Sequence, residues 1–140
     1  MGIRVRVKLL AEGREVETAA LASSGFESSE PDICVPLGLA RRLGLWPPAR
    51  FESEEAVTAG GEVPLLRLPV EAEVQLVAGG EVKSRSPCII VNPYVDEVLL
   101  SDYLIDELGI VPVSFRRGLW RHRSDPEGVA RESEEPQYWR

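Results

Sequence analysis

The sequence predicts a mainly β protein, a compact barrel or sandwich with two short helices. Three observations lead to this fold class. Runs of alternating apolar and polar residues recur along the chain, as in half-buried strands. The 12 glycines and 11 prolines favour many short elements joined by turns. Only two segments carry the apolar spacing of a helix, and a length of 140 residues fits a single domain.

Most strands are expected in hairpins with glycine-containing turns. Residues 12–13, 60–61 and 79–80 each lie between two strand-like runs, which is typical of hairpin turns. The first helix is expected to open at Pro36, where a missing N–H costs nothing, and to end at Gly44. The predicted strands are 3–10, 14–21, 32–35, 51–58, 62–68, 70–76, 82–86, 87–91 and 110–115, and the predicted helices are 36–44 and 98–108.

The charge balance argues against nucleic acid as a partner. The formal net charge is −7 at pH 7, so the domain lacks the basic surface that binds a phosphate backbone. The arginine cluster within 116–123 is interpreted as a solvated edge of the domain. The sequence has no signal-peptide pattern and no apolar run of the ~20 residues that a membrane span needs. We therefore expect a cytoplasmic protein without nucleic-acid or membrane partners.

The cysteines and the acidic helix residues do not form a metal-binding pattern. Cys34 and Cys88 lie far apart within apolar runs, so two buried free thiols are expected. A disulfide between them is the alternative, favoured in an oxidising compartment or a hyperthermophile. Asp102 and Asp106 share one face of the predicted helix and are interpreted as a solvated face, because no histidine accompanies them. The sequence thus predicts no metal and no cofactor.

Four segments in order resemble the retropepsin-like family of aspartic proteases. Residues 39–45 read Leu-Ala-Arg-Arg-Leu-Gly-Leu and match a helix that the family writes Leu-Ala-x-x-Leu-Gly-Leu. Residues 57–63 look like the family's flap hairpin, and residues 98–110 are similar to its Ile-Leu-Gly-x-Asp-x-Leu … Leu-Gly-Ile segment. Residues 115–120 match a common closing strand. The resemblance covers about residues 3–120 and implies a closed retropepsin-like (acid protease) β barrel.

The same resemblance places a serine where the family carries its catalytic aspartate. The Asp-Thr-Gly slot falls on Ser23, Ser24 and Gly25. Hydrolysis in the family uses two carboxylates that share one proton, and Ser23 supplies no carboxylate. The resemblance therefore implies a non-catalytic homodimer, in which two such loops meet at a two-fold axis and a cleft under the flap binds a peptide or protein. The implied binding residues are Ser23, Ser24, Gly25, Phe26, Ala59, Gly60 and Gly61.

Two other functions stay open at this point. A displaced carboxylate, Glu27 or Asp32, would restore an aspartic-type peptidase. A serine nucleophile would need its own base, and the only histidine, His122, follows the closing strand. The chain would otherwise be an acidic accessory subunit of a larger complex.

The C-terminal residues are expected to differ from the domain formed by residues 1–120. Residues 121–140 are mostly charged and polar, which predicts a tail that is loosely ordered or docked on a partner. The aromatic residues Tyr138 and Trp139 near its end suggest contact with the domain itself or with a second subunit.

Overall fold

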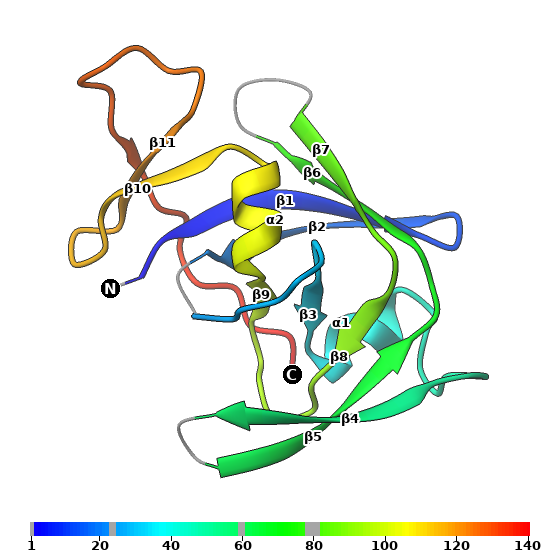
Figure 1. Cartoon of the computed structure of the whole chain (residues 1–140). Helices are drawn as coiled ribbons and strands as arrows, with labels where there is room; N and C mark the ends of the chain where they lie inside the picture. Colours follow the sequence, from blue (N-terminus) through cyan, green and yellow to red (C-terminus); the bar gives the residue numbers. More distant parts are fainter. Residues whose placement is uncertain (1, 23–24, 59–60, 78–81) are drawn as a thin grey trace.

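The computed structural model describes residues 2–22, 25–58, 61–77 and 82–140, without the side chains of 56–58. The chain is mainly β with two short helices (Figure 1), as the sequence predicts. The strands are β1 (Arg4–Ala11), β2 (Arg14–Leu21), β3 (Ile33–Val35), β4 (Glu52–Thr58), β5 (Gly61–Leu68), β6 (Ala72–Leu76), β7 (Val82–Ser86), β8 (Ile89–Val91), β9 (Val98–Leu100), β10 (Ile110–Ser114), β11 (Leu119–His122) and β12 (Arg131–Glu132), and the helices are α1 (Leu37–Arg42) and α2 (Asp102–Glu107).

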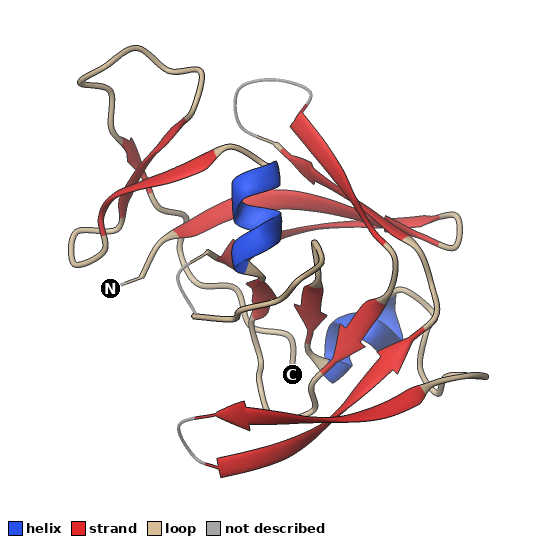
Figure 2. Ribbon diagram, in the orientation of Figure 1, coloured by secondary structure: helices blue, strands red, loops and turns tan. Residues whose placement is uncertain are grey.

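Nine strands form one sheet that curls into a half barrel (Figure 2). Their order is β4-β5-β8-β3-β9-β2-β1-β6-β7, and β10, β11 and β12 form a second, small sheet. In the middle of the large sheet, β9 lies between β2 and β3, parallel to β2 and antiparallel to β3. The two end strands, β4 and β7, are not paired with each other in the described chain, so the closed barrel stays a prediction.

The first hairpin forms as its alternating sequence predicts. Every second residue of β1 is buried, which places Val5, Val7 and Leu9 in the core. The turn uses positive φ at both central residues, 51° at Glu12 and 74° at Gly13, which matches the right-handed twist of the flanking strands. Most other predicted elements are present, with ends shifted by one or two residues.

The second predicted helix is wrong at its start. Residues 98–100 form strand β9, and α2 begins only at Asp102. The reason is that Val98 and Leu100 are buried between two neighbouring strands, and a short apolar run does not distinguish a strand from a buried helix turn. Ser101 then caps the helix, because its hydroxyl oxygen accepts a hydrogen bond of 3.2 Å from the backbone N–H of Leu104.

His122, the only histidine, has structural contacts. It is buried in β11, and its Nε2 lies 3.1 Å from the carbonyl oxygen of Leu108. Its Nδ1 lies 2.7 Å from the hydroxyl oxygen of Ser124. The ring packs on Gly109, which has a φ of 75° and where an added Cβ would lie 2.7 Å from Nε2. The imidazole thus holds the end of α2 against the small sheet.

Within residues 121–140, the stretch from Ser133 to Trp139 lies against the rest of the chain. The backbone N–H of Glu134 donates to the carbonyl oxygen of Arg4 at 2.9 Å, and the side-chain oxygen of Gln137 accepts from the N–H of Ala19 at 3.0 Å. The Trp139 indole packs against the core and donates a 2.9 Å hydrogen bond to the buried hydroxyl of Thr18. The segment therefore covers a part of β2 that lies outside the short stretch of β2 paired with β9. Docking on a further partner stays a prediction.

Within the part of the chain that the structure describes, no helix has the length and apolar character required to cross a membrane. Both helices contain six residues.

Candidate functional site

The predicted binding loop joins the two strands that flank β9. Ser23, Ser24, Ala59 and Gly60 lie outside the described residues. Gly25 is exposed and has a φ of 75°, a backbone conformation that favours glycine. Phe26 packs on a small apolar cluster, and its carbonyl oxygen accepts a 2.8 Å hydrogen bond from the N–H of Asp102. Gly61, the last predicted binding residue, begins β5 and is exposed, with a φ of 113°.

A surface cavity of about 350 Å³ lies beside Gly25. Helix α2 supplies Asp102, Ile105 and Asp106 to its wall, and Phe115, which follows β10, also lines it. The two carboxylates are exposed, and so is 57% of Phe115. The helix face that the sequence suggests is solvated therefore borders the predicted binding loop.

Asp32, the last residue before β3, has its carboxylate buried. Only 1% of the residue is exposed. Its Oδ2 accepts a 2.6 Å hydrogen bond from the hydroxyl of Ser28, and its Oδ1 lies 3.4 Å from Nη1 of Arg67 and 3.5 Å from Sγ of Cys88. A buried carboxylate needs such partners, because burial without them costs several kcal/mol. Asp32 thus anchors the C-terminal end of the loop to β5 and to the residues before β8.

Arg67 connects Asp32 to the exposed hairpin. It extends from β5 and bonds Glu54 of β4 through Nε at 2.8 Å, while its Nη1 lies 3.7 Å from a carboxylate oxygen of Glu30. The hydrogen bond to Arg67 lowers the pKa of Glu54. The same bond raises the pKa of Arg67 against the opposing effect of burial, with smaller contributions from Cys88 and Asp32. One guanidinium therefore balances carboxylates from the loop and from the hairpin.

Three of these groups have the atom types of a metal site. Ligand atoms of Glu30, Asp32 and Cys88 lie within 4.8 Å of one another. The guanidinium of Arg67 already lies among them, 2.7 Å from the Cys88 sulfur. Because a fixed positive charge takes the place that a metal ion would need, we interpret the group as a salt-bridge network.

Both cysteines are buried and free, as their apolar surroundings predict. Burial, reinforced by the charge of Asp32, raises the pKa of Cys34 to about 12. Burial and Asp32 also raise the pKa of Cys88 to about 11, and Arg67 opposes this shift. Neither thiol is therefore activated as a nucleophile at neutral pH.

The raised thiol pKa values predict a loss of stability in alkali. Well below pH 9.0, the unshifted value, both thiols are protonated in the folded and the unfolded chain. Between this pH and the folded pKa values, the unfolded chain loses thiol protons that the folded chain keeps, so the free energy of unfolding falls as pH rises. Urea unfolding in a reducing buffer, repeated across this range, should show a shallower fall for the Cys34→Ala, Cys88→Ala double variant. Equal slopes for the two proteins would contradict the prediction.

No protein-family model matches the chain, and no match is found among curated proteins. The resemblance to retropepsin-like proteases therefore stays a prediction that depends on the segments quoted above.

Proposed function

We propose that the chain is a non-catalytic, retropepsin-like homodimeric module that binds peptide or protein next to the loop between β2 and β3. The observation that carries this proposal is that the carboxylate of Asp32 is buried and already bound by neighbouring side chains. A general base has to reach the water or proton on which it acts. Asp32 is 1% exposed and is engaged by Ser28, Arg67 and Cys88. It is therefore poorly placed to replace the missing catalytic carboxylate.

The homodimer is supported by the apolar surface around Gly25. A retropepsin-like chain carries one loop of this kind, so a complete cleft requires two chains. Phe115, which lines the cavity beside Gly25, is 57% exposed, and Pro112 of β10, which lines the same cavity, is also exposed. Large exposed apolar groups that lie close together are typical of interaction surfaces. In this proposal the two copies bring their loops together across this surface.

The hairpin of β4 and β5 would form the other wall of the binding cleft. It stands in the place of the flap in the resemblance, and β4 is an end strand of the sheet. An end strand offers free backbone N–H and C=O groups to an extended peptide. Binding of this kind needs no catalytic acid. Glu52 and Glu55 are exposed on β4, so peptides with basic side chains are favoured.

The homodimer predicts a specific response to one substitution. Phe115→Asp places a charge in the proposed interface and should convert a dimer into a monomer in sedimentation equilibrium. Phe51→Asp is the matched control, because Phe51 is similarly exposed, at 54%, and does not line the cavity beside Gly25. A monomeric native protein, or equal masses for the two variants, would contradict the homodimer.

A second candidate function is a divergent aspartic-type peptidase. The observation that favours it is that Asp102 and Asp106 border the same cavity as Gly25. Two carboxylates one helical turn apart would supply the acid and base that Ser23 lacks. A cleavage assay separates this candidate from the non-catalytic module.

A further inference from the structure

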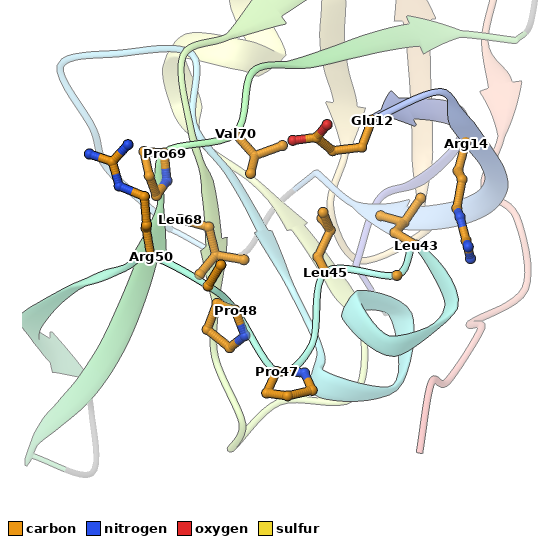
Figure 3. Close-up of a pocket in the computed structure, with 12 residues that line it drawn as sticks. Glu12, Arg14, Leu43, Leu45, Pro47, Pro48, Arg50, Leu68, Pro69 and Val70 are labelled. Carbon is orange, nitrogen blue, oxygen red and sulfur yellow. The ribbon is translucent and has the colours of Figure 1, made fainter.

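A second cavity lies between the end of α1, the turn of the first hairpin and the residues that follow β5 (Figure 3). Its volume is about 480 Å³. Small-molecule sites in proteins have volumes of roughly 300–1,000 Å³. None of its lining residues borders the cavity beside Gly25, so it is separate from the proposed peptide site.

The floor and walls of this cavity are apolar. Leu43, Leu45 and Leu68 form the floor and are themselves almost fully buried. The walls include Pro47, Pro48 and Pro69 (Figure 3). A proline ring restricts the backbone and removes the N–H donor, so these prolines hold the cavity in shape and offer no backbone N–H groups to a ligand. The body of a ligand is therefore expected to be apolar, and polar recognition must come mainly from side chains at the rim.

The rim carries two arginines and one glutamate. Arg14 lies at one end near Leu43, Arg50 at the other near Pro69, and the carboxylate of Glu12 is directed toward Val70 between them (Figure 3). None of the three charged side chains makes an ion pair or hydrogen bond with another described residue. The rim thus has an excess of one positive charge, although the whole chain has a net charge of −7.

The guanidinium of Arg14 packs closely on a glycine. A Cβ added to Gly44 would lie 3.1 Å from Cζ and 3.2 Å from Nη1 of Arg14. Gly44 has a φ of 72°, so glycine serves here both the end of α1 and the close approach of the guanidinium. This contact holds the positive group at the edge of the apolar floor.

We infer that this cavity binds a small carboxylic acid with an apolar body. The apolar part lies on the leucine floor between the prolines, and the carboxylate pairs with the guanidinium of Arg14, whose planar fork matches a carboxylate. Glu12 repels a second negative charge, so the ligand carries a single one. The inference does not depend on the proposed peptide site.

The test compares 3-phenylpropionate with its uncharged amide, using the backbone amide signals of Gly44, Leu45 and Val70 in NMR titrations. The acid should shift these signals saturably, with a Kd on the order of 1 mM for a ligand of this size. The amide should bind about fivefold more weakly, because it cannot form the ion pair. Equal affinities for acid and amide, or shifts that do not saturate, would overturn the inference.

Substitutions in and near the cavity show which arginine binds the carboxylate of the ligand. Arg14→Gln should remove the preference for the acid, whereas Arg116→Gln, at an exposed arginine outside the cavity, should keep it. Ala49→Trp places a large side chain at the exposed rim and should weaken the binding of acid and amide alike. Unchanged affinity of the acid for Arg14→Gln would also overturn the inference. Both ligands are tested on the native protein, so the comparison does not depend on the folding of any variant.

Discussion

Replacing Arg67 with methionine is expected to destabilise the protein by about 3–5 kcal/mol, because it leaves a buried carboxylate without its cation. Asp32 is 1% exposed, and Arg67 provides the positive charge near it, 3.4 Å from Oδ1. Methionine retains much of the side-chain volume, so the loss reports on charge rather than on a cavity. Urea unfolding at neutral pH measures this loss of stability.

Two further variants isolate the charge effect. Arg85→Met removes an exposed ion pair with Glu71 and should change the free energy of unfolding by less than about 1 kcal/mol. Combining Asp32→Asn with Arg67→Met removes both charges and should recover part of the stability lost in Arg67→Met alone. If Arg67→Met is no more costly than Arg85→Met, Asp32 is not an ion-paired anchor.

Replacing Trp139 with alanine should lower the free energy of unfolding by about 2–3 kcal/mol. The indole packs against the core, and its N–H bonds the hydroxyl of Thr18, which is fully buried. Large-to-small substitution of a fully buried tryptophan costs about 3–5 kcal/mol, and Trp139 is only partly buried. The variant therefore measures how firmly the C-terminal segment is held on its own domain.

The neighbouring residue provides the control for this prediction. Tyr138 is exposed, and Tyr138→Ala should change stability by no more than about 0.5 kcal/mol. Chemical unfolding of both variants shows whether the end of the chain is held on the domain or forms a loosely ordered tail. Equal small effects would mean that the last residues of the chain do not stabilise the domain, as in a loosely ordered tail.

Local sequence signals predict most of the elements of this fold. Alternation over β1 and β2, with the turn at Glu12 and Gly13, suffices for the first hairpin. Gly44 and Gly109 mark the ends of the two helices, because each follows the last helical turn with a positive φ. These features depend on neighbouring residues, which the sequence displays directly.

The features that the sequence does not predict depend on contacts between distant segments. The sequence predicts a helix for residues 98–100 because their apolar side chains satisfy either pattern, and only the position of β9 between β2 and β3 decides for a strand. The network around Asp32 joins residues from the loop, from β5 and from the segment before β8, so no local spacing reveals that Arg67 and Cys88 contact it. For Trp139 the sequence leaves contact with the domain or with a second subunit open, and the hydrogen bond to the distant residue Thr18 decides for the domain.

Cleavage of an unfolded protein substrate, from acidic to neutral pH, tests the proposal of a non-catalytic module most directly. The proposal predicts no cleavage at any pH, because the carboxylate of Asp32 is engaged and, in the resemblance, Ser23 takes the place of the catalytic aspartate. Cleavage that is blocked by a transition-state peptide mimic, and abolished by Asp102→Asn or Asp106→Asn, would contradict it and establish a peptidase.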